Sequence, residues 1–148
     1  MEIKVKKNDI LKNVNKLVEM YKKGLLGGEV MPEDSNPHLS KESIENYNYY
    51  TLPMALNYQR NSYKLWESAN QTWNDKETNF VFDTRRVSKT SFEQVQKALV
   101  KYKVALQQNK QTEMCIKLSN TINELFDGDI RKVFKINEYD VNKMRNYI

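Results

Sequence analysis

VALQQNKQTEMCIKLSNTINELFDG, residues 104–128, is the segment around which we expect the other helices to be arranged. Its apolar positions recur at steps of three and four residues, which is the spacing of one face of an α-helix. These positions are Cys115, Leu118, Ile122, Leu125 and Phe126. Gly128 follows them and tolerates the left-handed conformation that ends many helices. The pattern predicts a helix that begins after the polar loop 107–110 and ends at Gly128.

The start of this helix is polar and basic. Its first backbone N–H groups lack partners within the helix and carry the positive end of the helix dipole, with Asn109 and Lys110 beside them. A helix start of this kind suits a phosphate group. The same pattern describes an ordinary amphipathic helix that only packs against a core, so both interpretations stay open.

The N-terminal part of the chain carries a second strong helix signal. Asp9 is a candidate N-cap, and Gly24 is a candidate helix end. The apolar stripe between them consists of Ile10, Leu11, Val14, Leu17, Val18 and Tyr21. Residues 24–39 hold three of the four glycines and two of the three prolines, which predicts a loop. We expect four aliphatic side chains to hold this loop against the body, namely Leu25, Leu26, Val30 and Met31.

Shorter helix signals follow this loop. Ser40 is a candidate cap for a short segment, and Thr51 with Pro53 in the first turn predicts a new helix. The polar residues 57–62 predict a break before a further helix that ends near Trp73. One continuous helix from Pro53 to Trp73 is the alternative.

The remaining signals are brief. Residues 80–82 are the only candidate strand and are too short to imply a sheet. A capping box begins the next helix, with Thr90 and Glu93 or Ser91 and Gln94 as its alternative pairs. An amphipathic turn is expected at 130–134, and Asp140 is a candidate cap for a segment over 141–148. Together the signals predict an all-α fold, a single domain of six to eight short helices in an orthogonal bundle. Residues 1–39 form its N-terminal helix and loop, and residues 40–148 form its body.

The composition narrows the classes of function. The 24 Lys and Arg outnumber the 19 Asp and Glu, and the net charge of +5 favours anionic partners. One cysteine, Cys115, and one histidine, His38, argue against a disulfide, an iron–sulfur cluster and a zinc site, so we expect no metal or cofactor. No apolar run approaches the roughly 20 residues that span a bilayer, and the N-terminus has no signal-peptide core. We therefore expect a soluble, cytoplasmic protein with no membrane partner.

Catalytic patterns are scarce in the sequence. His38 lies in a proline-flanked loop with no predicted nucleophile beside it, and Gly27-Gly28 lacks the residues of a phosphate-binding loop. What remains is a polar and basic set, Gln59-Arg60-Asn61, Arg85-Arg86 and Asn109-Lys110. Asn, Gln and Arg offer paired donors to bases and phosphates, so this set predicts contacts with a nucleic acid.

Two blocks of sequence resemble a known family. LPMALNYQRNSYKLWE (52–67) is similar to the helix–loop–helix of the helix-hairpin-helix DNA glycosylase superfamily, the endonuclease III-like base-excision enzymes. SFEQVQKALVKYKVALQQNKQTEMCIKLSNTINELFDGDI (91–130) resembles that family's short helix, polar turn and long helix ending in Phe-x-Gly-x-Ile/Val. The resemblance implies that Gln59 enters the duplex near an extruded base, with Arg60 and Asn61 at the DNA backbone.

The family's catalytic end does not follow these blocks. In the family, the hairpin turn, the lysine nucleophile of bifunctional members and the catalytic aspartate come after the Phe-x-Gly helix. Here Gly128 is followed by DIRKVFKINEYDVNKMRNYI, and Asp140 stands in a different context. We therefore expect a portion that is not catalytic alone: a natural truncation, a piece of a longer chain, or half of a split protein completed by a second polypeptide.

Two functions follow from the sequence. The first is a DNA-repair-like module that binds double-stranded DNA through Gln59, Arg60, Asn61, Asn109 and Lys110, with no catalytic residue assigned. The second is a helical protein-interaction domain without a nucleic-acid role. The aromatic run 47–50, with Trp66 and Trp73, favours the second function because tyrosine and tryptophan are common in interfaces. The same aromatic residues are also expected in an ordinary core.

Overall fold

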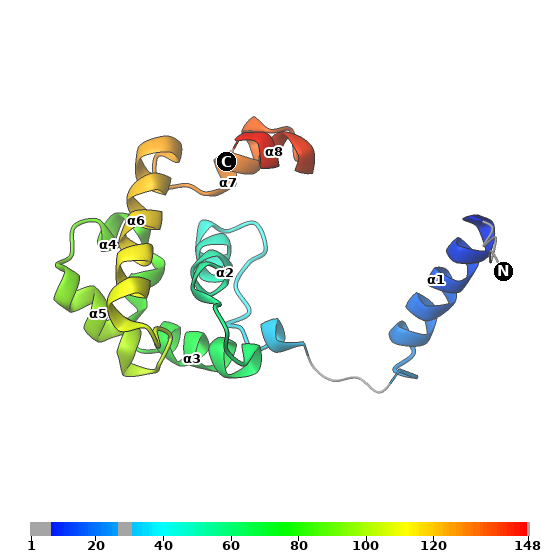
Figure 1. The fold of residues 1–148 in the computed structure, drawn as a ribbon, viewed down its shortest axis with the longest axis horizontal. Helices are drawn as coiled ribbons and strands as arrows, with labels where there is room; N and C mark the ends of the chain where they lie inside the picture. Colours follow the sequence, from blue (N-terminus) through cyan, green and yellow to red (C-terminus); the bar gives the residue numbers. More distant parts are fainter. Residues whose placement is uncertain (1–6, 27–30, 148) are drawn as a thin grey trace. The chain divides into compact units, whose positions relative to one another are not determined.

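Every regular element of the structure is helical, which confirms the predicted all-α fold. The computed structural model describes residues 7–26 and 31–147 (Figure 1). The α-helices are α1 (Lys7–Lys22), α2 (Ile44–Leu56), α3 (Ser62–Asn74), α4 (Thr84–Val87), α5 (Phe92–Lys101), α6 (Gln108–Phe126), α7 (Arg131–Ile136) and α8 (Val141–Tyr147). Two 3-10 helices are η1 (Pro32–Asp34) and η2 (Asn79–Phe82). None of the helices in this described part is long and apolar enough to cross a membrane.

The chain divides into two units, Met1–Met31 and Pro32–Ile148. The sequence analysis placed this division after residue 39. Residues 32–39 belong to the second unit, and the Tyr49 hydroxyl of α2 donates a hydrogen bond to the Ser35 carbonyl oxygen at 3.2 Å. This bond fixes the segment to the body of the protein.

The first unit contains α1. This helix begins at Lys7, so Asp9 lies within its first turn and the prediction that Asp9 is the N-cap is wrong. Gly24 follows the helix with a φ of +69°, as its predicted role requires. The predicted apolar stripe is exposed along its whole length, from 44% for Val18 to 62% for Tyr21.

The aliphatic residues after α1 are exposed too. Leu25, Leu26 and Met31 keep about half or more of their surface, at 65%, 46% and 54%. That they hold the loop against the body stays a prediction. Val30 lies outside the described residues. Within residues 7–26 of the first unit, taken by itself, no side chain is buried.

Helix α6 is the longest helix of the second unit and contributes Cys115, Ile122 and Phe126 to the buried interior. It begins at Gln108, inside the predicted polar loop. Leu125 is 60% exposed, contrary to the prediction. The buried face of α6 also includes three polar residues, Gln111, Thr112 and Ser119. Leu125 lies outside this face. Asp127 and Gly128 both have positive φ angles, and the Gly128 amide bonds to the Ile122 carbonyl oxygen at 3.1 Å, which ends the helix as predicted.

The core of the second unit is aromatic. The Tyr49 ring is fully buried and lies between 5.2 and 5.9 Å, centroid to centroid, from the rings of Tyr50, Trp66, Trp73 and Phe82. Burial raises the pKa of the Tyr49 hydroxyl, with a smaller contribution from Tyr50. Among the aromatic residues that favoured a protein interface in the sequence, Tyr49 and Trp66 are buried, and Tyr50 and Trp73 pack against the core. These four residues therefore fit the other interpretation, an ordinary core.

Helix α2 differs from the prediction. It is one helix from Ile44 to Leu56, capped by Ser43, whose side chain accepts a hydrogen bond from the Asn46 amide. Pro53 lies inside it and not in the first turn of a new helix. Proline removes one helical hydrogen bond, but Pro53 is near the C-terminal end and is buried, which offsets the loss.

The break after α2 is confirmed, and the alternative of one helix from Pro53 to Trp73 is excluded.

Residues 79–82 form η2 and not a strand. The capping box uses Ser91 and Gln94. The Asp140 carboxylate accepts hydrogen bonds from the Asn142 and Lys143 amides, as an N-cap does.

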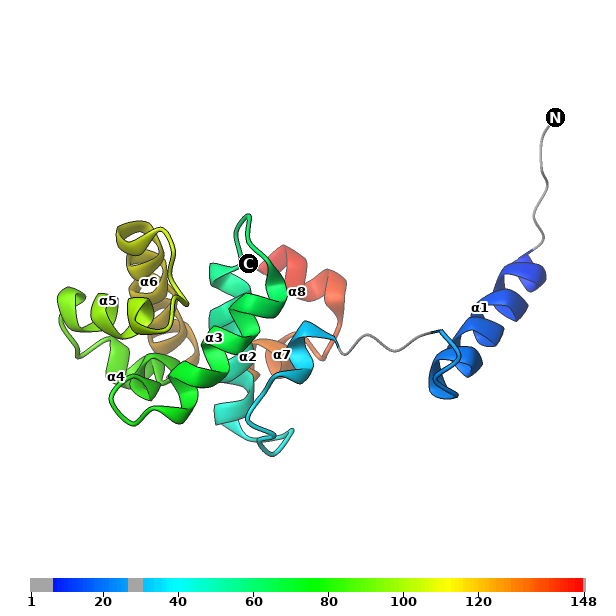
Figure 2. The same cartoon turned by 90° about the horizontal axis from the view of Figure 1, so that it is seen from below.

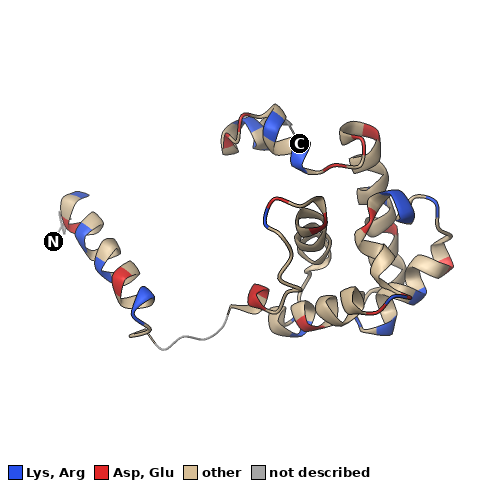
Figure 3. Ribbon diagram, turned by 180° about the vertical axis from the view of Figure 1, so that it is seen from behind, with Lys and Arg blue, Asp and Glu red and all other residues tan. Residues whose placement is uncertain are grey.

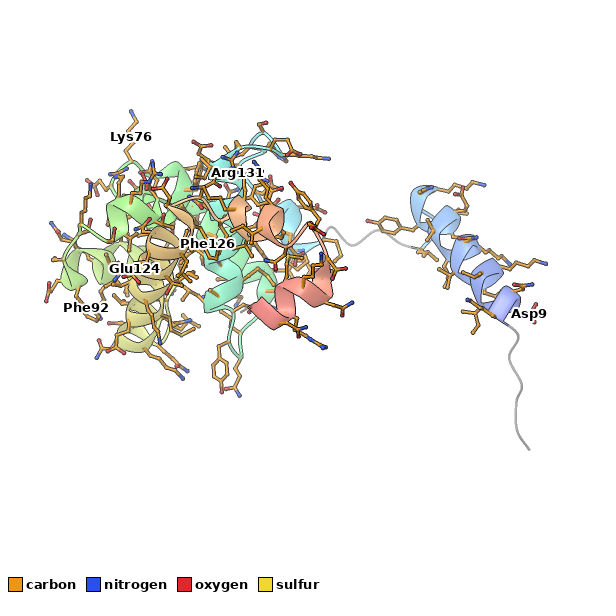
Figure 4. All side chains as sticks on the ribbon, turned by 90° about the horizontal axis from the view of Figure 1, so that it is seen from above. Asp9, Lys76, Phe92, Glu124, Phe126 and Arg131 are labelled. Carbon is orange, nitrogen blue, oxygen red and sulfur yellow. The ribbon has the colours of Figure 1, made fainter. Side chains whose placement is uncertain are left out.

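The helices of the second unit cross at steep angles, as in an orthogonal bundle. In Figure 1, α6 runs upward while α3 runs across the base, and Figure 2 shows α3 passing over α2. Arg131, labelled in Figure 4, joins α7 to the start of α2 because its Nη1 donates to the Glu42 carbonyl oxygen at 2.8 Å. The same guanidinium forms an ion pair with Asp129 at 2.7 Å.

Candidate nucleic-acid interface

The connection between α2 and α3, residues 57–61, is the centre of the candidate site and is called the elbow below. Its last residue, Asn61, caps α3 by accepting a hydrogen bond from the Lys64 amide at 3.1 Å. Gln59 is exposed at the turn and has a φ of +47°. A left-handed conformation in a residue other than glycine costs on the order of 1–3 kcal/mol and persists where the surroundings enforce it.

The side chain of Arg60 holds the elbow in this conformation. Its Nη1 donates to the carbonyl oxygens of Lys103 and Val104, at 2.9 and 2.8 Å, in the connection between α5 and α6. Burial lowers the pKa of the guanidinium, and its Nε atom is buried without a partner. The Arg60 Nη1 is therefore already held by two carbonyl groups of the protein itself. The contact of Arg60 with the DNA backbone stays a prediction.

Gln111 ties the same connection to the end of α2. Its Nε2 donates to the Leu56 carbonyl oxygen at 2.8 Å, and its Oε1 accepts from the Leu106 and Gln107 amides at 2.6 and 2.7 Å. The side chain is 4% exposed. The sequence analysis did not single out this residue, although its position four residues before Cys115 places it on the apolar face.

The elbow and the start of α6 lie side by side. The Lys110 ammonium lies over the Tyr58 ring, 5.4 Å from its centroid, in a cation–π contact. Gln59 and Lys110 are both exposed. Tyr58 precedes Gln59 in the chain, so Gln59 and Lys110 belong to one continuous exposed region. Asn109 points elsewhere, because its Oδ1 accepts a hydrogen bond from Gln96 of α5 at 2.7 Å.

A groove of about 700 Å³ runs between α3 and the connection that follows α5. It is lined by Gln59, Arg60, Asn61, Lys64, Glu67, Ser68, Gln71, Lys101, Tyr102, Lys103 and Leu106. The three elbow residues predicted from sequence therefore meet in one groove, whereas Asn109 and Lys110 lie outside it. Lys64 and Lys103 are exposed and form no ion pair within residues 7–26 and 31–147. The sequence analysis did not select either lysine.

The third groove lysine, Lys101, is neutralised by the protein. Its ammonium contacts the Asp75 and Glu77 carboxylates at 2.6 and 2.9 Å, and the Tyr102 hydroxyl donates to Asp75 at 3.0 Å. The hydrogen bond from Lys101 lowers the pKa of Asp75, and Asp75 in turn raises the pKa of Lys101. Among the groove lysines, Lys64 and Lys103 are therefore the two whose charge no carboxylate of the described residues neutralises.

Arg85 and Arg86 do not join the elbow. The Arg85 Nη2 donates to the Asp127 carbonyl oxygen at 2.6 Å, and the Arg86 guanidinium lies 5.5 Å from the centroid of the Phe80 ring. Asp127 follows the C-terminal end of α6, about 25 Å along the helix from Lys110 at a rise of 1.5 Å per residue. These arginines line a separate cavity of about 360 Å³.

The one cysteine and the one histidine of the sequence lie outside the elbow. Cys115 is buried, and desolvation raises the pKa of its thiol to about 12 despite a hydrogen bond with Ser119. His38 is exposed in a turn, where its amide bonds to Asn36. No group of three His, Cys, Asp or Glu within the described ranges is placed to hold a metal ion. Figure 3 shows Lys and Arg interleaved with Asp and Glu along the ribbon, so the positive charge is spread over many elements.

Comparisons of this chain with protein-family models, with curated proteins and with solved structures found no match. The resemblance to the helix-hairpin-helix DNA glycosylases stays a prediction, as does a second polypeptide that completes the fold.

Proposed function

We propose that this protein is a DNA-binding helical module, and that it contacts DNA through the elbow and the start of α6. The observation that supports this most is the contact of Lys110 with Tyr58, 5.4 Å from ammonium to ring centroid. It joins a cationic helix start to an exposed glutamine turn 51 residues earlier in the sequence. Amide, ammonium and helix-start N–H groups are the donors that proteins use for phosphates and base edges.

The rigidity of the elbow also supports this function. Gln59 and Lys103 both have left-handed backbones, with φ angles of +47° and +62°, and Arg60 connects their segments. Strained residues held by their surroundings are frequent at functional sites. A glutamine fixed in this way is prepared to meet a ligand without first losing conformational freedom.

Three exposed lysines are the proposed phosphate ligands. Lys64 and Lys103 line the same groove as Gln59, and Lys110 contacts the neighbouring Tyr58. None of the three has a carboxylate partner in the described part of the chain. Arg60 acts as the brace that holds the elbow and not as a phosphate ligand. No catalytic role is proposed for any residue.

The test is the salt dependence of binding to a short labelled duplex, followed by fluorescence anisotropy. Each phosphate contact steepens the plot of log affinity against log salt by about 0.9. We expect the variant Lys64→Ala/Lys103→Ala/Lys110→Ala to lower the slope by about 2 to 3 and the affinity at about 50 mM salt by at least roughly tenfold.

A matched control separates a defined site from a general effect of charge. The variant Lys41→Ala/Lys89→Ala/Lys135→Ala removes three exposed lysines outside the elbow and gives the same net charge of +2, from +5. The proposal requires this control to bind almost as tightly as the native chain. Equal losses in both variants, or no binding by the native chain, would contradict it.

A further inference from the structure

The elbow separates two surfaces of different shape. On one side, Lys110 at the exposed start of α6 lies over the ring of Tyr58 in the elbow, and neither residue lines the groove. On the other side is the groove of about 700 Å³, which Lys64 and Lys103 line. Gln59 lines the groove and follows Tyr58 directly, so it stands at the boundary between the two surfaces.

The size of the groove limits what enters it. A volume of about 700 Å³ lies within the range of sites that hold small molecules, so a short length of one strand fits inside the groove and a double helix meets only its rim. The outer surface around Lys110 has no such limit and can lie against a double helix. The two sides of the elbow therefore suit different forms of nucleic acid.

The chemistry of the groove suits an unpaired strand. Lys64 and Lys103 supply positive charge near the elbow, where phosphates would pass. Further along α3, Ser68 and Gln71 offer hydrogen-bonding groups, and Glu67 places a carboxylate in the same wall. A carboxylate repels phosphates and accepts hydrogen bonds from amino groups of bases, so bases rather than phosphates face this part.

We infer that the ligand is DNA at a junction between duplex and single strand, with Gln59 at the branch point. This inference depends on the proposed DNA-binding function. The duplex arm lies against Tyr58 and Lys110, and the unpaired arm follows the groove along α3. Unpaired bases are accessible for such contacts because they are already out of the helical stack.

The experiment compares three labelled DNAs of the same duplex or strand sequence at one salt concentration: a blunt duplex, a single strand, and a fork that carries one unpaired arm. We expect the 148-residue chain to bind the fork about tenfold or more tightly than either other DNA, because both surfaces are then engaged. In Lys64→Gln/Lys103→Asn, we expect the fork and the duplex to bind within about twofold of each other. Asparagine is chosen at position 103 because it tolerates a positive φ.

Two controls make the outcome specific. Lys110→Gln weakens fork and duplex binding together, so the preference for the fork remains. Lys89→Gln/Lys135→Gln, which lies outside both surfaces, leaves affinity and preference unchanged. Circular dichroism confirms that each variant is folded.

Three results would overturn the inference. The first is equal affinity of the native chain for fork and duplex, which leaves the proposed DNA-binding function intact. The second is a fork preference that survives Lys64→Gln/Lys103→Asn, which places the unpaired arm elsewhere. The third is a single strand that binds as tightly as the fork. Absence of binding to all three DNAs would overturn the proposed function as well.

Discussion

Arg60 donates its Nη1 to the carbonyl oxygen of Lys103 at 2.9 Å, and this hydrogen bond joins two turns that are 43 residues apart in the sequence. The same nitrogen reaches the next carbonyl oxygen, that of Val104, at 2.8 Å. Both turns carry a left-handed residue, Gln59 in one and Lys103 in the other. The guanidinium is therefore the element that gives the elbow its shape.

Replacing Arg60 tests this role. Arg60→Ala leaves two carbonyl groups without their charged donor, and we expect a loss of about 2 kcal/mol in the free energy of unfolding. Arg60→Lys restores little of it, because a lysine ammonium lacks the planar, fixed geometry of the guanidinium. Urea unfolding measures both values. A loss for Arg60→Ala that does not exceed the error of the measurement would show that the elbow holds its shape without this residue.

The variant Gln59→Gly is expected to change the free energy of unfolding and the affinity for DNA in opposite directions. Glycine adopts a positive φ without the steric cost of a side chain, so we expect the free energy of unfolding to rise by about 1 kcal/mol. DNA binding should fall several-fold, because the amide at the proposed branch point is lost. Unfolding and anisotropy measurements on the same sample report both effects. Unchanged binding in a stabilised variant would mean that Gln59 is only a turn residue.

Asp75 predicts a dependence of stability on pH. Its contact with Lys101 lowers the pKa of Asp75 in the folded state relative to the unfolded value of about 3.9. The ion pair therefore contributes fully above that unfolded value, and the contribution is lost as the pH falls through the lower, folded pKa. We expect Asp75→Asn to lower Tm at pH 7 and to flatten the fall of Tm in acid. If the Tm of Asp75→Asn falls in acid as steeply as the Tm of the native chain, other carboxylates cause that fall.

Gly128 is constrained by both its backbone and its surroundings. It has a φ of +70°, and a Cβ atom there would lie 2.5 Å from the Arg85 Nε and 3.0 Å from the Asn123 Oδ1. We expect Gly128→Ala to cost about 1–2 kcal/mol in unfolding free energy from the backbone alone, and more from the clash with Arg85. The double variant Arg85→Ala/Gly128→Ala should then cost less than the sum of the two single changes. Strict additivity would argue against the clash.

The helices that the sequence predicts well are those with strong local signals. Helix α6 has a regular apolar spacing and a glycine end, the elbow is a run of polar residues, and α5 begins with the Ser91–Gln94 capping box. These features depend on residues within one or two helical turns. Such local signals are sufficient to place the corresponding elements.

Features that depend on distant contacts were missed or misassigned. Pro53 reads as a helix start by its type, but burial between neighbouring helices keeps it inside α2. The sequence predicts that Arg60 binds phosphate. In the structure its Nη1 donates to two carbonyl groups in the connection between α5 and α6. No local pattern shows which carbonyl groups will face a side chain after folding. The same reason explains why Lys64 and Lys103, which line the groove, were not selected.

The most direct test of the elbow as a DNA-binding surface is a titration of the ¹⁵N-labelled full-length chain with duplex DNA, followed by NMR chemical shifts. We predict that the largest shifts fall on two segments, the elbow with the first turn of α3, and residues 103–110 at the start of α6. Shifts that concentrate on α7 and α8, or no shifts at about 50 mM salt, where electrostatic binding to DNA is strong, would contradict the proposal.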